Sequence, residues 1–408
     1  MSGIIVGGGI VGLTTALVLH RSGIEVRVFE EAVKLKELGL GLNVLPHSVQ
    51  HLVGLDLQGR LDTEGVRTGE LRFFCKKGKA IWQEPRGMNA GYDMPQYSIH
   101  RGRLQRLLKE QVIKRLGKAA LVTDRRLVKF ENTPEGVAAT FKGEAGETII
   151  EEGEFLIGAD GINSMVRQQL YPDQSDPHFA GLMLWRGTTI SDSFLTTNTM
   201  IMAGHSDQKV VVYPISNPDD SGKQLLNWVA EFRVPMNTMH RDDWNKEGLL
   251  VEFADRFSDW KFDWLDLPEL FRNAEHIFKF PMVDRDPIDQ WSFTRVTLAG
   301  DAAHAMYPNG SNGASQGILD AISLEKQLST ISDIPAALTA YEEERRPPTS
   351  RLILENRKTG PEKVLQLVED RCDGRCGERH TCVPEAELKE IAQAYKKLAG
   401  FDKKSVNK

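Results

Sequence analysis

The chain has 408 residues, of which 40% are hydrophobic and 26% are charged, as in an ordinary globular protein. Since single hydrophobic cores stop growing at about 250–300 residues, this length predicts two cores. The formal net charge of −6 argues against a nucleic-acid partner. No apolar run reaches the roughly 18 residues of a membrane span without glycines and polar breaks, so we expect no membrane association.

The N-terminal stretch Ile4 to Leu19 is apolar enough to resemble a signal peptide. It lacks a basic leader, however, and glycines interrupt it at the spacing of a dinucleotide motif. The four cysteines, three of them near the C-terminus, do not predict a disulfide framework in a chain of this length. We therefore expect a cytoplasmic location, while the sequence leaves both a monomer and a homodimer open.

Residues 3–30 are predicted to form a strand, a turn, a helix and a second strand. The turn carries Gly7-x-Gly9-x-x-Gly12, which places a pyrophosphate against the N-terminus of a helix. Glu30 ends the second strand, where its carboxylate can accept from ribose hydroxyls, so we do not expect this site to hold NADP. The candidate cofactor-binding residues of this segment are Gly7, Gly9, Ile10, Val11, Gly12, Glu30 and Glu31.

Two further candidates for the cofactor site lie in the middle of the chain. Arg101 begins a predicted helix, and its guanidinium matches a pyrophosphate bidentately, although an exposed surface arginine is the alternative. Asp160-Gly161 follows the buried strand Phe155 to Ala159. The Asp160 carboxylate could hold this loop beside a cofactor or approach a nicotinamide, and an ordinary strand-to-helix turn is the alternative.

From about residue 181 to 232 the pattern changes to short alternating strands, which predicts an antiparallel insertion. Its parity favours Trp185, Tyr213 and Trp228 on comparable faces, where they would line an aromatic pocket or simply fill the sheet core. Met202 is a further candidate for substrate contact. A charged, tryptophan-rich stretch from about 241 to 274 is expected to be helical.

A second glycine-rich turn follows the apolar strand Arg295 to Ala299. Asp301 can hydrogen-bond the ribityl hydroxyls of a flavin, and Gly300 leaves room for them. The loop after it opens the next helix, whose N-terminal amides can stabilise charge on a reduced flavin; its candidate residues are Pro308, Gly310, Asn312, Gly313 and Ala314. His304 is expected to pack or hydrogen-bond rather than to act in catalysis. Helix is predicted from Asp320 until Arg346-Pro-Pro348. Two such turns at opposite ends of a chain indicate one long ligand, FAD, held from both sides.

The tail from about residue 361 carries zinc-type ligands at a non-standard spacing, Cys372, Cys376, His380 and Cys382. We expect free surface thiols there and no metal, with a structural metal as the alternative. A charged helix is predicted from Pro384 to Leu398.

Together these motifs resemble the group A flavoprotein monooxygenases, the aromatic hydroxylases with the p-hydroxybenzoate hydroxylase fold. The resemblance covers about residues 3–360 and is greatest to the branch of phenazine hydroxylases typified by 5-methylphenazine-1-carboxylate 1-monooxygenase. Runs outside the cofactor motifs carry it most specifically: Glu84-Pro-Arg-Gly87, Pro95 to Gly102, Trp185-Arg-Gly187, Tyr213 to Ser216, Asn227-Trp-Val229, Pro281 to Pro287 and Asp301 to Asp320.

The resemblance implies an α/β fold in which an antiparallel β-sheet is inserted into a Rossmann-like FAD-binding domain. We expect the FAD-binding domain at 1–75, 96–178 and 276–360, the substrate-binding sheet domain at 76–95 and 179–275, and a C-terminal helical tail at 361–408.

The resemblance also implies roles for individual residues. Glu30 would bind the adenosine ribose, Arg101 the phosphates and Asp301 the ribityl–pyrophosphate region. Pro308 and the backbone from Gly310 to Ala314 would lie against the isoalloxazine ring, with Gly39 to Asn43, including Gly41, on its other side. Family members often have Asn where this chain has Ser315, which puts one flavin contact in doubt.

The activity that the resemblance implies is hydroxylation of an aromatic or heteroaromatic substrate, phenazine-like or a phenolic carboxylate. NADH or NADPH would reduce the flavin, and O2 would react to give a C4a-hydroperoxide, so no catalytic side chain is expected. Alternatives are epoxidation, Baeyer–Villiger insertion or decarboxylative hydroxylation on the same fold, or a flavin-binding protein without turnover.

Overall fold

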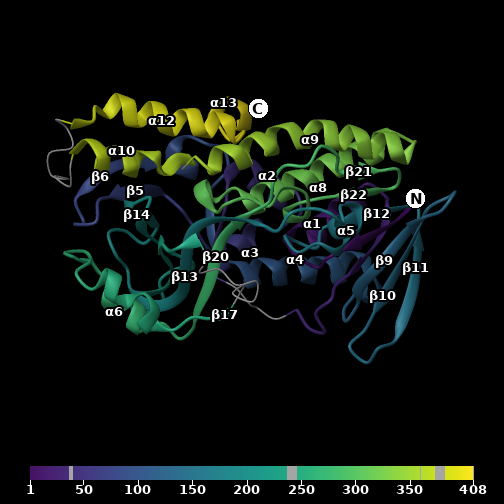
Figure 1. Cartoon of the computed structure of the whole chain (residues 1–408), viewed down its shortest axis with the longest axis horizontal. Coiled ribbons are helices and arrows are strands. Elements are labelled where there is room, and N and C mark those ends of the chain that lie inside the picture. The colour runs from purple at the N-terminus through teal and green to yellow at the C-terminus, as the bar shows by residue number, and fades with distance from the viewer. Residues whose placement is uncertain (36–39, 237–245, 359, 373–381, 408) are drawn as a thin grey trace.

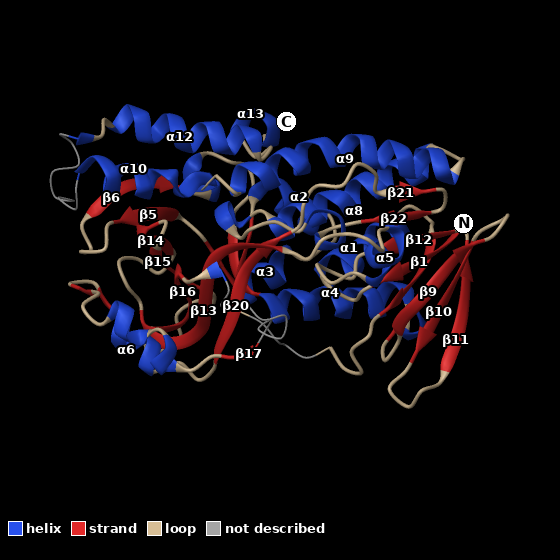
Figure 2. Cartoon of the chain, viewed as in Figure 1, coloured by secondary structure: helices blue, strands red, loops and turns tan. Residues whose placement is uncertain are grey.

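The computed structural model describes residues 1–35, 40–236, 246–358, 360–372 and 382–407. Figure 1 shows a long layer of helices along one side of the molecule, with sheets beneath it. A mainly parallel six-stranded sheet forms one half, and a mainly antiparallel eight-stranded sheet forms the other (Figure 2). This is the α/β fold with an inserted sheet that the sequence predicts.

The six-stranded sheet carries the first glycine-rich turn at its centre. Its order is β21-β22-β12-β1-β2-β8, and β1 pairs in parallel with both β2 and β12. The bounds are β1 Ser2–Val6, β2 Glu25–Phe29, β8 Leu121–Val122, β12 Phe155–Gly158, β21 Ser292–Phe293 and β22 Val296–Leu298. Helices α1 (Ile10–Arg21), α4 (Arg101–Leu116) and α8 (Gly313–Thr330) pack together beside it, and α5 (Met165–Leu170) and α7 (Asp301–His304) begin next to its strand ends.

Two three-stranded sheets flank this core. One has the order β3-β7-β4, and the other has the order β11-β10-β9. The second is a meander of three consecutive strands that the sequence did not predict. The bounds are β3 Gly41–Val44, β4 Gly65–Arg67, β7 Tyr97–His100, β9 Arg126–Asn132, β10 Val137–Lys142 and β11 Thr148–Gly153, with helices α2 Pro46–Val53 and α3 Gln58–Glu64.

The eight-stranded sheet has the order β17-β20-β13-β16-β15-β14-β5-β6. Its bounds are β5 Glu70–Phe74, β6 Ala80–Pro85, β13 His178–Asp192, β14 Thr199–His205, β15 Gln208–Pro214, β16 Lys223–Arg233, β17 Lys246–Glu247 and β20 Ile277–Asp284. Strands β5 and β20 lie in ranges that we assigned to the FAD-binding domain, yet their ladders join them to this sheet. The sheet therefore extends beyond the expected 76–95 and 179–275.

The stretch from about 241 to 274 is not the long helix that we predicted. Residues 241–245 lie outside the described residues, and the rest forms short turns, a small hairpin and one short helix, α6 (Leu267–Arg272). Its aromatic side chains pack on one face of the eight-stranded sheet, which accounts for the tryptophans without a helical period.

Helix α9 (Ile334–Asn356) continues through Pro347 and Pro348, where the sequence predicted its end. A proline removes one helical hydrogen bond and leaves a carbonyl one turn earlier without its donor. Those carbonyls belong to Glu343 and Glu344 on the exposed face, where water can replace the lost donors. On the opposite face of the helix, Tyr341 and Leu352 are buried.

The C-terminal tail forms the helices α10 (Lys363–Cys372), α12 (Glu385–Leu398) and α13 (Lys403–Val406). Helix α10 packs on β14 and β6, so the tail covers the second face of the eight-stranded sheet (Figure 1). Cys372 and Cys382 form a disulfide, and Cys75 is also disulfide-bonded. The expectation of free surface thiols is therefore wrong for Cys372 and Cys382, because the fold brings them together where the tail packs on the sheet.

The disulfide leaves neither Cys372 nor Cys382 as a thiolate ligand for a metal, and Cys376 and His380 lie outside the described residues. Within the described parts of the chain, no helix is long and apolar enough to span a membrane.

Candidate active site

The three motif glycines meet different surroundings. Gly7 has φ +106°, and a Cβ there would lie 2.4 Å from the Ala159 carbonyl oxygen. A Cβ on Gly12 would lie 2.0 Å from the Gly7 oxygen, so both positions admit only glycine. A Cβ on Gly9 would meet nothing within 4 Å. Gly9 therefore faces open space at the N-terminus of α1.

That space is a cleft of about 410 Å³ in front of the first turn. It brings together six of the sequence-predicted residues, Gly7, Gly9, Glu30, Glu31, Arg101 and Asp160. Three residues that the sequence reading missed also line it, namely Gln105, Arg125 and Arg126. The position of Gln105, one turn after Arg101 on α4, is the signal that could have identified it, and its amide donates to the Gly8 oxygen at 2.7 Å.

Two acids of the cleft are hydrogen-bonded to backbone amides. Glu30 accepts from the amides of Gly8 at 2.7 Å and Ala32 at 2.9 Å. Asp160 accepts from the Ser164 hydroxyl and from the amides of Met165 and Val166. Burial raises the pKa of the Asp160 carboxyl, while these hydrogen bonds work in the opposite direction. Asp160 thus fixes the N-terminus of α5 at the edge of the cleft.

The second glycine-rich turn packs directly on the first. A Cβ on Gly300 would lie 2.8 Å from Val11, and one on Gly317 would lie 2.4 Å from it. Ile10 and Val11 are thus covered by the fold, and Ile10 belongs to the hydrophobic core. The absence of side chains at Gly300 and Gly317 allows α1 and α8 to approach each other.

A fully buried acid on α8 locks this arrangement. Asp320 accepts from the Gly300 amide at 2.9 Å, from His304 at 2.6 Å and from Arg345 at 2.8 Å. Burial works against the charged carboxylate, but His304 and Arg345 together hold the pKa of Asp320 below its usual value. His304 is therefore a buried hydrogen-bonding residue, as the sequence indicated.

Asp301 is exposed, in contrast to its neighbours Ala302 and Ala303, which are buried. Its carboxylate would lie 3.9 Å from a Cβ on Gly313, at the start of α8. Pro308, Gly310 and Asn312 form the loop before that helix. The structure thus places the Asp301 carboxylate beside the glycine-rich helix start, as a flavin clasped there would require.

We call residues 308–313 the ring loop, because the family resemblance assigns it to the isoalloxazine ring. Gly310 has φ +71°, and Asn312 is fully buried. The Asn312 Nδ2 donates to the Gly310 oxygen and to the Tyr395 hydroxyl, whereas its Oδ1 has no partner among the described residues. Ser315, which replaces the usual Asn, is also buried and accepts from the Leu45 amide at 3.0 Å.

Gly41 lies flat against the eight-stranded sheet. Its amide donates to Asn227 Oδ1 at 2.7 Å, and its oxygen accepts from Arg186 at 3.1 Å. A Cβ there would lie 2.7 Å from Asn227 and 2.8 Å from Tyr213. The neighbouring Gly39 lies outside the described residues. Gly41 is thus the point where the cofactor half of the molecule meets the sheet.

The side chains around Gly41 form an electropositive polar cluster. Arg186 stacks on Phe280, and burial, together with the nearby Arg101, lowers the pKa of its guanidinium. Burial raises the pKa of the Tyr213 hydroxyl to about 12, so the phenol stays protonated. Two covered donors have no hydrogen-bond partner among the described residues, Arg186 Nε and Asn227 Nδ2. Asn227 Nδ2 lies near the Tyr213 hydroxyl without hydrogen-bond geometry.

The four candidate substrate residues do not share a face, which corrects the sequence prediction. Tyr213 and Met202 belong to the face that the tail and Gly41 cover. Trp185 and Trp228 lie on the opposite face, packed against Phe253. The register explains the error: Trp228 pairs with Val212, and Tyr213 pairs with Asn227, so the tryptophan and the tyrosine alternate across the sheet.

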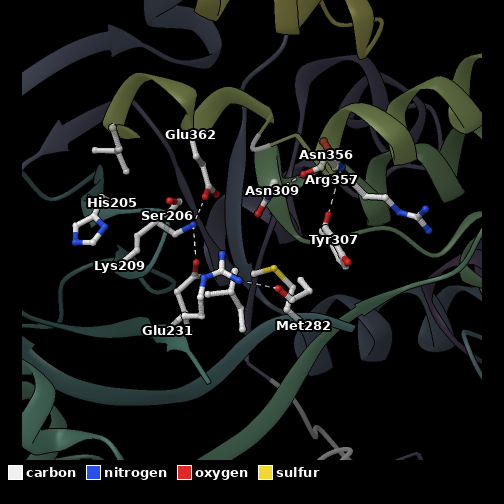
Figure 3. Close-up of a pocket in the computed structure, with 14 residues that line it drawn as sticks. His205, Ser206, Lys209, Glu231, Met282, Tyr307, Asn309, Asn356, Arg357 and Glu362 are labelled. Atoms are coloured by element: carbon white, nitrogen blue, oxygen red, sulfur yellow. Dashed lines mark hydrogen bonds and ion pairs between the residues drawn. The ribbon is translucent and has the colours of Figure 1, made fainter. Parts of the chain in front are cut away.

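A cavity of about 100 Å³ lies farther along the tail-covered face (Figure 3). Lys209 crosses it and pairs with Glu231 at 2.9 Å and with Glu362 at the start of the tail. Burial disfavours the charged amine, but the two carboxylates raise the pKa of Lys209 above its ordinary value. This buried cluster fastens the tail to the sheet, and Asn309 of the ring loop and Asn356 line the same cavity.

The residues present fit a bound FAD. The open space at Gly9 has room for phosphates, the exposed Asp301 lies at the second turn, and the buried Asn312 Oδ1 has no donor among the described residues. These features run from one glycine-rich turn to the other, as an extended dinucleotide requires.

Comparisons with known proteins agree with this geometry. Residues 1–355 match the family described as FAD binding domain. The chain is 44% identical over 360 residues to phenazine 1,6-dicarboxylic acid hydroxylase PhzS of Lysobacter antibioticus, covering 87% of this chain and 88% of that protein. It is 32% identical to 3-amino-4-hydroxybenzoate 2-monooxygenase PtnB3 of Streptomyces platensis, covering 90% and 91%.

Solved structures agree on the fold. HpxO of Klebsiella pneumoniae, complexed with FAD and uric acid, superposes with a TM-score of 0.73 at 22% identity, covering 98% of this chain and 92% of that one. Because the family match spans most of the chain and a relative exceeds 30% identity, the chain belongs to the group A FAD-dependent aromatic monooxygenases, which use NAD(P)H and O2.

Proposed function

We propose that this enzyme hydroxylates a planar heteroaromatic carboxylate of the phenazine type. The observation that carries the proposal is the cluster at Gly41, where Arg186 Nε and Asn227 Nδ2 are covered donors for which the described residues provide no acceptor with hydrogen-bond geometry. No ion pair joins Arg186 to a carboxylate in the described part of the chain, and the charge of another arginine, Arg101, contributes to lowering its pKa. A carboxylate on the substrate would supply the missing acceptors and the missing negative charge.

The chemistry of the cluster favours an anion with two oxygens. A buried donor without a partner loses its hydrogen bonds to water and gains none in the protein, which costs free energy. Such donors therefore usually bind a ligand or an ordered water. Arginine presents parallel donors that match a carboxylate, and the stacked Phe280 orients the guanidinium. Leu184, Met202 and Val229 surround the cluster with the apolar surface that a planar ring needs.

The names of the relatives point the same way. PhzS of Lysobacter antibioticus acts on a phenazine dicarboxylic acid, and PtnB3 of Streptomyces platensis acts on an aminohydroxybenzoate. Both substrates carry a carboxylate on an aromatic ring. The greater identity to PhzS favours the larger, fused-ring substrate for this chain.

In this proposal FAD lies along the two glycine-rich turns. FAD supplies the redox chemistry with NAD(P)H and O2. Gly9 and Arg101 would receive its phosphates, Glu30 its adenosine ribose and Asp301 its ribityl chain. The ring would lie between the ring loop and Gly41, with the substrate against Arg186. The residues that we propose for the site, beyond the substrate cluster, are Gly7, Ile10, Val11, Gly12, Glu31, Asp160, Gly300, Pro308, Gly310, Gly313 and Ala314.

We extend the proposal to the organisation of the chain. The parallel sheet with α1, α4 and α8 would form the FAD-binding domain, the eight-stranded sheet the substrate-binding domain, and residues 361–408 the tail. The reductant is either NADH or NADPH, and the enzyme is a monomer or a homodimer in the cytoplasm.

Replacing the guanidinium tests the substrate class directly. We expect Arg186→Met to raise KM for phenazine-1,6-dicarboxylic acid by about 10–150-fold, since a hydrogen bond to a charged group contributes about 1.5–3 kcal/mol. For the corresponding dicarboxamide, KM should change by less than about threefold in the same variant. Initial rates of substrate-stimulated NAD(P)H oxidation measure both values.

Arg256→Met is the matched control, because Arg256 stacks on Phe232 on the opposite face of the same sheet. It should leave both KM values unchanged. Equal KM values for the acid in wild-type enzyme and Arg186→Met would rule out carboxylate recognition by this cluster.

A further inference from the structure

The C-terminal tail contacts the ring loop through Tyr395 of α12. Helix α12 buries Leu388, Ala392 and Tyr395, at the spacing of one helix face. Leu388 packs in the cluster that joins the tail to the sheet, while the Tyr395 side chain reaches the end of α9 at Asn356. The tail therefore touches the part of the site where the sequence predicts the flavin ring.

The Tyr395 hydroxyl is the centre of a buried hydrogen-bond group. It accepts from Asn312 Nδ2 at 2.8 Å, and it lies 3.1 Å from the Asn309 oxygen and 2.9 Å from Asn356 Oδ1. One hydroxyl proton serves one of these two acceptors at a time. Burial raises the pKa of Tyr395 well above its usual value, so the hydroxyl keeps this proton. The hydroxyl thus joins both ends of the ring loop to α9.

The loop is shaped around this hydroxyl. Gly310 adopts φ +71°, and a Cβ there would lie 2.2 Å from the Tyr395 oxygen. Gly360, with φ +53°, borders the same ring from the other side, where a Cβ would lie 3.3 Å from it. Tyrosine therefore occupies a slot between two glycines in the left-handed region, a conformation that other residues rarely adopt.

A second contact fixes the adjoining helix. Gln316, in the first turn of α8, donates to the Ala399 oxygen of the tail at 3.1 Å. Its Oε1 accepts from Arg345 at 2.7 Å, and Arg345 also pairs with Asp320. The start of α8 is thus held by the tail and by the same buried acid that holds Gly300.

We propose that Tyr395 is a positioning residue of the flavin site, holding the ring loop in the shape that receives the isoalloxazine ring. The inference rests on the proposed contact between the ring loop and the ring. It adds the tail to the active site, through a side chain that reaches the cofactor only by way of Asn309, Gly310 and Asn312.

Tyr395→Phe removes the hydroxyl and keeps the ring in its slot. Asn312 Nδ2 then loses one of its two acceptors and keeps the Gly310 oxygen, and Asn356 Oδ1 loses the hydroxyl as a donor. Because the loss of one buried hydrogen-bond partner is equivalent to about 5–150-fold in an equilibrium constant, we expect FAD affinity to fall by about tenfold or more. We also expect the visible absorption band of bound FAD to shift. Affinity is measured by flavin fluorescence quenching on apoprotein, without substrate.

Tyr92→Phe is a matched control. The Tyr92 hydroxyl also joins the body of the molecule to the tail, donating to the Phe401 oxygen at 2.6 Å. Its hydrogen bond in the described structure is to Phe401, outside the ring loop. Tyr92→Phe loses one buried hydrogen bond between tail and body and Tyr395→Phe loses two, so both melting temperatures should fall, and that of Tyr395→Phe should fall further. Only Tyr395→Phe should change FAD affinity and the flavin spectrum.

A double-mutant cycle provides the second measurement. Asn312→Ala removes the donor to the same hydroxyl, so its effect on FAD affinity should be smaller in Tyr395→Phe than in the wild-type background. Additive effects would contradict the proposal, as would equal loss of FAD affinity in Tyr395→Phe and Tyr92→Phe, or an unchanged flavin spectrum in Tyr395→Phe. Since no substrate is present, these outcomes are independent of whether the substrate is a carboxylate.

Discussion

The two ends of the proposed FAD site are built in different ways. At the nucleotide end, Gly7, Gly9 and Gly12 belong to one strand, turn and helix, and the Gly12 backbone packs on the Gly7 oxygen. At the ring end, the ring loop depends on Asn356 and Tyr395, side chains distant in the sequence. The first end follows from local backbone geometry, and the second requires the whole fold.

The largest test of this difference is the removal of Asp320. Its carboxylate holds Gly300, His304 and Arg345 at the ring end and makes no contact at the nucleotide end. Because breaking a buried ion pair leaves an uncompensated charge, Asp320→Ala should lower the free energy of unfolding by about 3–5 kcal/mol. Urea denaturation of the apoprotein measures it. Asp301→Ala is the control, since that carboxylate is exposed in the same segment. A loss below about 1 kcal/mol in Asp320→Ala would show that the network does not hold the ring end.

Acid should weaken the contact between α2 and the tail. His47 of α2 stacks on Phe401 of the tail, and burial, followed by the charges of Arg345 and His51, lowers its pKa from 6.5 to about 3. Between pH 6.5 and 3 the unfolded chain binds a proton that the folded chain does not bind. The contribution of His47 therefore lowers the free energy of unfolding as the pH falls below 6.5, by about 2 kcal/mol at pH 5.

Between pH 7 and pH 5 the free energy of unfolding should fall by about 2 kcal/mol less in His47→Gln than in the wild-type protein. Urea denaturation at the two pH values provides the comparison. His20→Gln, at an exposed position on α1, should behave as the wild type does. Identical pH dependence in His47→Gln and the wild type would mean that the imidazole is protonated in the folded protein.

The smallest expected effect is a change in ligand affinity in Asp301→Ala, which should distinguish the ring end from the nucleotide end. Asp301→Ala should lower FAD affinity by about tenfold, because one hydrogen bond to a charged group is lost, without a change in the free energy of unfolding. ADP lacks the ribityl chain and the ring, so its affinity should not change. Isothermal titration of the apoprotein with each ligand tests this. Equal weakening of FAD and ADP would place Asp301 at the nucleotide end instead.

The sequence predicts what local chemistry determines. The strand, turn and helix around Gly7, the strand before Asp301 and the helix that begins at Gly313 lie where their residues indicate. Each depends on a few neighbouring residues: an apolar run, a glycine at a crowded or left-handed position, and a helix start. The fold class follows from the same local signals in chain order.

The remaining features depend on register and on distant packing. The face that Trp185 and Trp228 occupy is set by their pairing with Ala230 and Val212, which parity along a single strand does not reveal. The disulfide of Cys372 and the hydrogen bonds of Tyr395 join elements that have no common local pattern. Helix α9 passes through Pro347 because the affected carbonyl is exposed, a fact that appears only in three dimensions.

The contact between Tyr395 and Gly310 has a consequence for how the enzyme is made. Tyr395 follows Gly12 by roughly 380 residues, so at about 5–20 residues per second a ribosome adds it about 20–80 s later. The residues that line the nucleotide cleft end at Met165, whereas the proposed slot for the ring requires nearly the whole polypeptide. If the ring loop holds the isoalloxazine ring as proposed, FAD binding is complete only at the last stage of biosynthesis.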